Sequence, residues 1–323
     1  MTGRERILRT LNFEEPDYPP HFETMFELEY EAFGEHFPPF AAWAQYNTAD
    51  KARAVEHCMD IYEKIVSRYR WDGLLVFWPW CDADGVRAAR KRFGNELFIG
   101  AIVGGSVWSI EALSYRTFDD VDWTGFAVMT VEEPEKIHAI ARRKSAEAIE
   151  KIKPVLDAGC DFVHIVNDVA FNGGPFLAPA QFHEFITPYL KEQVDFIKSR
   201  GAFAFVHSDG DINPVLDDYL SLGAHCFQSV DPMAGMDLAT VKARCRNRMA
   251  LMGNVQCSYL QDGPAECIRQ STLYALEHGT PGGGYIFGTS NTIFKGLPLE
   301  HYEYMLDVFH DFCNHLKRKQ SQP

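Results

Sequence analysis

Two residue types that can move protons stand together near the middle of the chain. The segment 203–206 reads Phe-Ala-Phe-Val and is followed by His207-Ser208-Asp209-Gly210. An apolar run rich in aromatic and β-branched residues is typical of a buried parallel strand. Since side chains alternate along a strand, His207 and Asp209 are expected on one face at its carboxyl end, where parallel α/β folds place their chemistry. An imidazole beside a carboxylate is a general acid–base pair, and the alternative is a core histidine followed by a turn aspartate.

Polar side chains also follow other apolar segments of the same kind. Parallel strands of a barrel bring their carboxyl ends to one mouth, so these residues are expected to meet there. We predict that Asp168 joins His207 and Asp209 in catalysis. The residues predicted to bind substrate are Asn167, Gln228, Asn254, Gln256, Ser290 and Asn291, with Trp78 and Trp80 as an apolar wall. Each polar residue in this set also favours turns and helix caps, so a purely structural role stays open for any one of them.

The same histidine and aspartate offer atoms that a metal can use. His207 and Asp209 are the candidate ligands, and Cys257 or Asp168 could be recruited as a third. A catalytic zinc is normally held by three protein ligands, and the sequence marks only this one pair. The pattern therefore allows a metal without requiring one.

The predicted strands alternate with helical segments along the chain. Eight apolar segments qualify as strands: 21–26, 73–77, 127–131, 162–166, 203–207, 226–230, 249–253 and 285–288. This alternation favours a parallel sheet, and eight such units in 323 residues favour a closed (β/α)8 TIM barrel. An open doubly wound sheet would want a glycine-rich phosphate turn after its first strand, which this sequence lacks. We predict an α/β fold, with a single barrel domain over residues 1–323.

Two additions to a plain barrel are expected. Thr2 and Glu5 form a capping box that begins an amino-terminal helical extension. Residues 84–125 read as an inserted excursion after the second strand. A second capping box, Thr130 with Glu133, is expected to begin the long helix that follows.

Composition limits the partners and the compartment. The chain has a formal net charge of -14 and a pI near 5.3, which disfavours nucleic acid and anionic membranes as partners. No apolar run approaches the length of a membrane-spanning helix, and the first residues lead into a helix without a signal-peptide core. Eight scattered cysteines without a C-x-x-C pair predict reduced thiols in a cytoplasmic protein. The oligomeric state stays open.

The order of motifs in the second half of the chain resembles a known superfamily. The run at 207–210 is followed by Gly253-Asn254-Val255, by Ile286-Phe287-Gly288, and by Pro298 and Glu300. This order is similar to that of the uroporphyrinogen decarboxylase superfamily. The resemblance implies a (β/α)8 barrel and one of two activities, which are porphyrinogen decarboxylation and methyl transfer to or from a corrinoid protein.

The sequence departs from the decarboxylases of that superfamily at two places. Their amino-terminal substrate segment carries arginines that pair with the carboxylates of an anionic tetrapyrrole, whereas the matching segment 21–30 has three glutamates and no arginine. Burying several carboxylates without cations is costly. Their F-x-D motif corresponds here to Phe77-Trp78-Pro79, which lacks the aspartate. Decarboxylation of uroporphyrinogen is therefore disfavoured.

The methyltransferase branch of the superfamily is the closer match. Its H-x-C-G motif and a later cysteine bind a zinc ion that activates a thiol. His207 matches the first ligand, Asp209 stands in the place of the second, and the segment 289–291 has no cysteine. Without the two soft thiolates, a zinc site of that kind is disfavoured.

The resemblance and the residues together predict a corrinoid-dependent methyltransferase. A methyl group would pass from a small methylated donor, such as a methoxylated aromatic, to a corrinoid on a separate protein, because the D-x-H-x-x-G signature of a corrinoid-binding domain is absent. His207 with Asp209 and Asp168 would protonate the oxygen that leaves when an ether is cleaved. A decarboxylase or lyase on the same scaffold and a non-catalytic tetrapyrrole-binding barrel are the alternatives.

Overall fold

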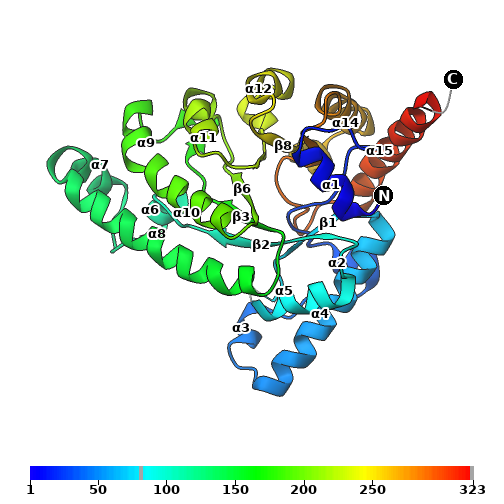
Figure 1. Cartoon of the computed structure of the whole chain (residues 1–323), viewed down its shortest axis with the longest axis horizontal. Coiled ribbons are helices and arrows are strands. Elements are labelled where there is room, and N and C mark those ends of the chain that lie inside the picture. The colour runs from blue at the N-terminus through cyan, green and yellow to red at the C-terminus, as the bar shows by residue number, and fades with distance from the viewer. Residues whose placement is uncertain (80–82, 321–323) are drawn as a thin grey trace.

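The computed structural model describes residues 1–79 and 83–320, and its centre is a curled sheet of seven parallel strands. In spatial order the strands are β1 (Gly73–Val76), β2 (Phe98–Gly104), β3 (Phe162–Val166), β6 (Phe203–His207), β7 (Cys226–Gln228), β8 (Ala250–Val255) and β9 (Tyr285–Thr289). A short hairpin, β4 (Ala170–Phe171) with β5 (Gly174–Pro175), stands apart from this sheet. Helices surround the outside of the sheet (Figure 1), which is the α/β architecture of a TIM barrel, as predicted.

The helices follow the strands in the order that a barrel requires. They are α1 (Gly3–Leu11), α2 (Glu29–Phe33), α3 (Phe40–Trp43), α4 (Thr48–Tyr69), α5 (Ala83–Phe93), α6 (Ile110–Ser114), α7 (Trp123–Glu132), α8 (Pro134–Asp157), α9 (Pro179–Phe185), α10 (Thr187–Ser199), α11 (Leu216–Ser221), α12 (Leu238–Cys245), α13 (Cys257–Asp262), α14 (Ala265–Gly279) and α15 (Leu299–Gln320). Among the residues that the structure describes, none of these helices combines the length and the apolar composition needed to cross a membrane. The seven cysteines of this part of the chain are all free thiols, as expected.

An irregular segment joins the two edges of the seven-stranded sheet. The Phe287 N–H of β9 donates to the Pro20 carbonyl (2.8 Å), and the Asp72 N–H before β1 donates to the His21 carbonyl (2.8 Å). The segment predicted as the first strand, 21–26, therefore lies where an eighth strand belongs, but it forms only isolated bridges. The prediction of a regular strand is wrong there: Pro19 and Pro20 have no N–H to donate to a ladder, and the His21 N–H donates to the Asp72 carboxylate (2.9 Å).

The predicted excursion at 84–125 is also wrong, since its centre is a barrel strand. β2 pairs with β1 on one side and with β3 on the other. At Gly100 the Phe162 ring occupies the space that a side chain would need, because an added Cβ would lie 2.2 Å from that ring. Gly100 therefore lets β2 pack closely against Phe162 in the barrel interior.

The segment 127–131, predicted as a strand, belongs to helix α7. The Asp122 side chain begins this helix by accepting a hydrogen bond from the Gly125 N–H (2.8 Å). Because β2 already lies between β1 and β3, no sheet edge is left for the segment, and it forms a helix beside α8. The Thr130 hydroxyl donates to the Ala127 carbonyl (2.7 Å), so the predicted capping box with Glu133 is wrong as well.

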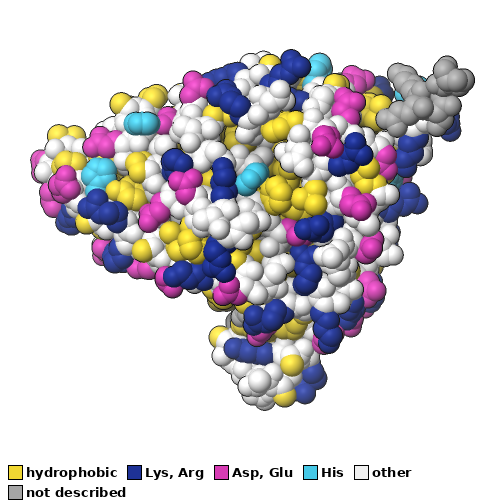
Figure 2. Space-filling model, viewed as in Figure 1, with side chains coloured by type: hydrophobic (Ala, Val, Ile, Leu, Met, Phe, Trp, Pro, Cys, Tyr) yellow, Lys and Arg dark blue, Asp and Glu magenta, His cyan; other side chains and the backbone are white. Residues whose placement is uncertain are grey.

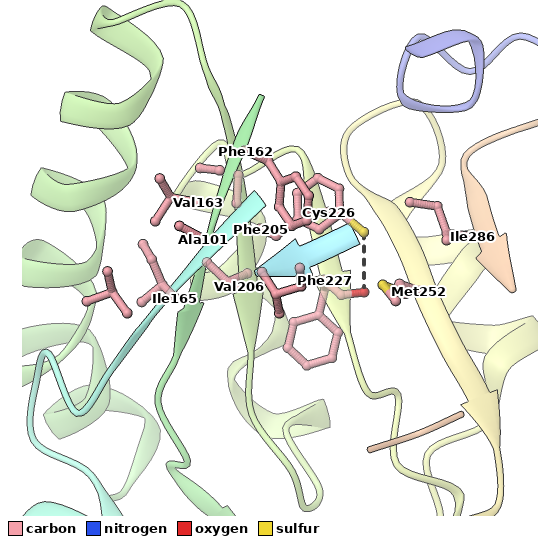
Figure 3. Close-up of a cluster of buried hydrophobic side chains, with 14 of the residues drawn as sticks. Ala101, Phe162, Val163, Ile165, Phe205, Val206, Cys226, Phe227, Met252 and Ile286 are labelled. Atoms are coloured by element: carbon pink, nitrogen blue, oxygen red, sulfur yellow. Dashed lines mark hydrogen bonds between the residues drawn. The ribbon is translucent and has the colours of Figure 1, made fainter. Parts of the chain in front are cut away.

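Aromatic rings fill the barrel interior. The Phe162 ring lies 5.0 Å from that of Phe98 and 4.5 Å from that of Phe205, measured between centroids. Figure 3 shows Phe162 and Phe205 together, with Val163 and Ile165 of β3 directed toward a neighbouring helix. Both faces of these strands are buried, which explains why their sequences read as continuous apolar runs.

The amino-terminal helix α1 covers the amino ends of the strands. Its predicted capping box is present, because the Thr2 hydroxyl accepts from the Glu5 N–H (3.1 Å) and the Glu5 carboxylate accepts from the Thr2 N–H (2.9 Å). The Arg6 guanidinium then pairs with Asp72 (2.5 Å), just before β1, and Arg4 pairs with Asp161 (3.0 Å), just before β3. The buried Arg6–Asp72 pair and the partly buried Arg4–Asp161 pair tie the helical extension to the barrel.

Candidate active site

The three residues predicted to be catalytic meet at the carboxyl ends of two neighbouring strands. His207 is the last residue of β6, and Asp168 follows the adjacent β3. The His207 Nε2 lies 3.4 Å from the Asp168 Oδ1 and 3.5 Å from the Asp209 Oδ1. The Asp209 N–H also donates to the Asp168 Oδ1 (2.9 Å). The expected proximity is therefore found, with one imidazole between two carboxylates.

The other nitrogen of His207 is held by the amide of Gln228 on β7. The Gln228 Nε2 donates to the Ser290 carbonyl (3.2 Å), which orients the amide so that its Oε1 faces the His207 Nδ1. An amide oxygen only accepts, so the Nδ1 carries a proton and donates it to Gln228. This leaves the Nε2 to face the two carboxylates.

The Asp209 carboxylate is fixed from two further strands. The Ser229 hydroxyl donates to its Oδ1 (3.0 Å), and the Asn291 amide donates to its Oδ2. Gly210 follows in a left-handed conformation (φ +83°), and an added Cβ there would lie 2.3 Å from the Ala170 carbonyl oxygen. Only glycine fits this close approach, which accounts for the glycine next to Asp209.

Burial and the mutual charges of this cluster shift the pKa values of all three residues. Burial alone would lower the pKa of His207, but its hydrogen bond with Asp168 and the negative charges of Asp209 and Asp168 raise it to about 9. Burial alone would raise the pKa of Asp168, but the hydrogen bond and charge of His207 lower it to about 2. Burial raises the pKa of Asp209, despite the opposing charge of His207. At neutral pH the cluster thus holds an imidazolium beside the Asp168 carboxylate and a second carboxyl group that accepts protons more readily.

Glu111 belongs to the cluster, although it is not among the residues predicted from the sequence. A side-chain hydrogen bond joins its carboxyl group to Asp168, and burial, with the Asp168 charge adding to it, raises the pKa of Glu111. The Ile110 N–H donates to the Asp168 carbonyl (2.8 Å), which anchors the first turn of α6 at this point. A sequence signal is present in Ser109, the N-cap of α6, but it lies in the segment 84–125 that is predicted as an excursion.

A cavity of about 410 Å³ opens beside Asp209. Its lining residues are Asp209, Asp231, Met233, Cys257, Ser258, Gln261, Ser290, Asn291, Thr292 and Phe294. Two predicted substrate-binding residues, Ser290 and Asn291, are therefore in the cavity wall. No lysine or arginine is among these described lining residues, so the cavity is acidic.

The remaining amide residues make local contacts. Asn167 donates to the Trp108 carbonyl (3.2 Å), and Asn254 donates to the Val230 carbonyl (2.9 Å). Gln256 donates to the hydroxyl of the serine two residues further on (2.7 Å). None of the three is among the residues that line the cavity beside Asp209, and their role in substrate binding stays a prediction.

The predicted aromatic wall is described only in part. Trp78 stacks on Phe37, with ring centroids 4.5 Å apart and planes 7° apart. The backbone N–H of Trp78 donates to the Tyr62 hydroxyl (2.8 Å). It belongs to an aromatic cluster near the end of β1 and does not line the cavity beside Asp209. Trp80 lies outside the described residues.

Comparison with known proteins places the chain in a family. The family model described as uroporphyrinogen decarboxylase (URO-D) matches residues 83–312. The chain belongs to the uroporphyrinogen decarboxylase family.

Individual members of the family resemble the chain at low identity. The uroporphyrinogen decarboxylase of Chlorobium limicola is 23% identical over 221 residues, which are 66% of this chain and 60% of that protein. The one from Anaeromyxobacter dehalogenans is 27% identical over 233 residues, or 71% and 63%. The chain thus spans 60 to 63% of the length of these curated relatives.

A solved structure covers more of the chain. It is a methyltransferase from Methanosarcina mazei, with a TM-score of 0.71 over 97% of this chain and 99% of that one, at 18% identity. At this identity the likeness concerns the fold alone. The two proteins share this fold over almost the entire chain.

A metal at the cluster would have to use oxygen and nitrogen donors. Ligand atoms of Asp168, His207 and Asp209 lie within 4.8 Å of one another. Cys257 lines the neighbouring cavity, but burial raises the pKa of its thiol to about 11. The described residues therefore do not fit the thiolate-rich zinc site of the methyltransferase branch. A cation bound by His207 and Asp209 stays a prediction, and a proton on His207 satisfies the same two carboxylates.

Proposed function

We propose that this protein is a corrinoid-dependent methyltransferase. It takes a methyl group from a small methylated donor, such as a methoxylated aromatic compound, and delivers it to a corrinoid on a partner protein. The observation that carries the proposal is the His207 imidazolium, held at the barrel mouth between Asp168 and Asp209. The bound corrinoid supplies the methyl-accepting chemistry.

The protein's own residues handle the proton. When the carbon–oxygen bond of a methyl ether breaks, the leaving alkoxide or phenolate needs a proton or a positive charge. The His207 Nε2–H, which faces the two carboxylates, is the donor that we assign. Asp168 keeps the ring charged before the reaction, and Asp209, whose pKa burial raises, returns a proton afterwards.

The acidic cavity supports a small donor over a tetrapyrrole with many carboxylates. Asp209 and Asp231 line it without a lysine or arginine among the described lining residues. A polyanionic substrate would bring further negative charge into the same space, at a high electrostatic cost. The Methanosarcina mazei protein, which carries the name methyltransferase, has the same fold over almost its whole length, in agreement with this reading.

Decarboxylation is the second candidate, because the family model and the curated relatives carry that name. In that reaction His207 would protonate the carbon from which carbon dioxide leaves. The same imidazolium serves both reactions, so the substrate distinguishes them.

Substrate panels separate the two candidates. The protein is incubated with a reduced corrinoid protein and a set of methyl ethers. The demethylated alcohol or phenol is measured by chromatography, and methylation of the corrinoid protein is followed by its absorbance. A parallel reaction contains uroporphyrinogen and is assayed for carbon dioxide. Ether-dependent methyl transfer that is lost in His207→Ala supports the proposal, whereas carbon dioxide release without methyl transfer overturns it in favour of the decarboxylase. Binding of a tetrapyrrole without turnover in either assay supports the non-catalytic alternative.

A further inference from the structure

A second cavity lies at the opposite end of the barrel from His207. It has a volume of about 640 Å³. Met249 directly precedes β8 and Gly284 directly precedes β9, so the cavity opens at the amino ends of these strands. The other lining residues are Phe13, Ala239, Lys242, Ala243, Arg246, Asn247, Glu277, His278, Pro281, Gly282 and Gly283.

Lys242 of α12 has unusual surroundings in this cavity. Its Nζ donates to the carbonyls of Gly283 (2.9 Å) and Gly279. Residues 1–79 and 83–320 contain no carboxylate within ion-pair distance of this nitrogen. The Nζ also lies 5.8 Å from the centre of the Tyr285 ring. A half-buried lysine with two backbone acceptors and no anionic partner differs from the surface lysines of the chain.

The Lys242 Nζ is held by neutral groups. Its two backbone carbonyl acceptors can accept from either protonation state, and no carboxylate of the described residues lies close enough to pair with the ammonium form. Burial lowers the pKa of Lys242 to about 8, and the charge of Glu15 opposes this only in part. The other charged or titratable groups that line the cavity are Arg246, Glu277 and His278. Near pH 8 about half of the Lys242 side chains then have a free lone pair, against well under ~1% for an ordinary lysine.

We propose that Lys242 is a carbonyl-reactive amine at a second ligand site, which binds a small aldehyde or ketone that carries an anionic group. The Nζ lone pair attacks the carbonyl carbon to give a carbinolamine. The carbinolamine loses water to form a carbon–nitrogen double bond, and no oxidant or reductant is consumed.

The lining of the cavity determines the class of ligand. Arg246 and His278 provide cationic and hydrogen-bonding groups for a phosphate or carboxylate, while Phe13 and Met249 form an apolar wall. The structural alternative is that Lys242 only bridges the end of α14 to β9 as an ammonium group. Residues at the amino ends of barrel strands usually serve stability, so a chemical test has to separate the two readings.

Labelling of the intact protein makes that test. Pyridoxal 5′-phosphate, an aromatic aldehyde with a phosphate, is added near pH 8, and the imine is reduced with borohydride. Peptide mass spectrometry then gives the rate at each lysine. Lys242 should label about 10- to 100-fold faster than the exposed Lys91, because of its larger neutral fraction. Equal rates would overturn the proposal in favour of the structural bridge.

Two variants test the parts of the site separately. Lys242→Arg should remove the fast label while circular dichroism and thermal unfolding show a folded protein. Arg246→Ala should slow labelling of Lys242 by pyridoxal 5′-phosphate severalfold, but should leave reductive methylation by formaldehyde, which has no anionic group, unchanged. If Arg246→Ala changes neither reaction, the anionic part of the ligand assignment is wrong.

Discussion

The two ends of the barrel both bury charge, but they balance it differently. At the amino end, Arg6 is 4% exposed and pairs with Asp72 and Asp17, so the buried charges of Arg6 and Asp72 are paired with each other. Figure 2 shows basic and acidic side chains interspersed over the face that carries α1. At the carboxyl end, the single imidazolium of His207 faces both Asp168 and Asp209. The amino end therefore uses charge to hold the strands together, and the carboxyl end keeps an excess of acid beside a cavity.

The pKa values of the buried groups also differ between the two ends of the barrel. At the amino end, burial raises the pKa of Asp72 to about 6 even though Arg6 lies beside it. At the carboxyl end, the carboxylates outweigh burial and raise the pKa of His207 to about 9. Burial thus raises the pKa of Asp72 more than Arg6 lowers it, whereas the carboxylates around His207 raise its pKa more than burial lowers it, so His207 is a proton donor at neutral pH.

The largest expected effect is loss of turnover on removing the imidazolium. His207→Ala should lower the rate of methyl transfer by about 10²- to 10⁴-fold, the usual contribution of an acid–base group. Its free energy of unfolding should change by only about 1–2 kcal/mol. Steady-state kinetics and urea unfolding measure the two quantities. The matched control is His225→Ala at the amino end, where the ring only accepts the Ala204 N–H (3.0 Å), so turnover should be kept. If His207→Ala unfolds, or retains full activity, His207 is a core histidine.

A substitution in the buried ion pair at the amino end should lower stability and leave turnover unchanged. Arg6→Met leaves Asp72 buried without its cation and should lower the free energy of unfolding by about 3–5 kcal/mol. The turnover of the remaining folded molecules should stay unchanged. Arg53→Met, which breaks the exposed pair with Asp50, is the control and should cost less than about 0.5 kcal/mol. Equal costs for the two variants would contradict the role assigned to the buried pairs.

The pH dependence of stability sharpens the comparison further. The folded-state pKa of His207 is about 9 and its unfolded value is about 6.5. Its stabilising effect is therefore complete below about pH 6.5 and disappears as the pH rises through 9. Turnover that needs the imidazolium falls only around the folded-state pKa of about 9. The effect is at most about 3 kcal/mol, because the lowered pKa of Asp168 reports the same interaction and is not added.

Urea unfolding of the wild type and of His207→Gln at several pH values measures this effect. The difference in stability between the two proteins should shrink between about pH 6.5 and 9, which separates His207 from other groups that titrate there. On the acid side, the lowered pKa of Asp168 stabilises the fold above about pH 4, and that stability is lost as the pH falls toward 2. A difference that stays constant from pH 6 to 10 would exclude the imidazolium.

The smallest expected effect concerns Glu111. Glu111→Ala removes the hydrogen bond to Asp168 and should lower turnover by about tenfold, which corresponds to one hydrogen bond of about 1–1.5 kcal/mol. Glu111→Gln keeps a donor for Asp168 and should retain most of the rate. The control is Glu147→Ala on α8, where only exposed pairs with Arg143 and Lys144 are broken. If Glu111→Gln is as slow as Glu111→Ala, the carboxyl group of Glu111 itself is needed, and its role is not to position Asp168.

Six of the eight predicted strands are barrel strands in the structure, because their apolar runs are buried on both faces and are bounded by glycine and polar residues. The prediction missed the seventh strand of the sheet, β2, and assigned a strand to the segment 127–131. The residues 127–131 have the composition of a strand, yet β2 already pairs with β1 and β3, so they form part of α7. Composition describes one segment at a time, whereas pairing depends on which neighbours are available.

The candidate site could also be predicted from the sequence only in part. Strand alternation and the convergence of parallel strands were enough to bring His207, Asp209 and Asp168 together from the sequence. The link from Glu111 to Asp168 joins residues far apart in the chain, and no local pattern encodes it. The protonation of His207 was also beyond the sequence, because a pKa depends on burial and on the distance to neighbouring charges. Residue types by themselves thus determined which groups could move a proton, and tertiary packing decided which of them carries it.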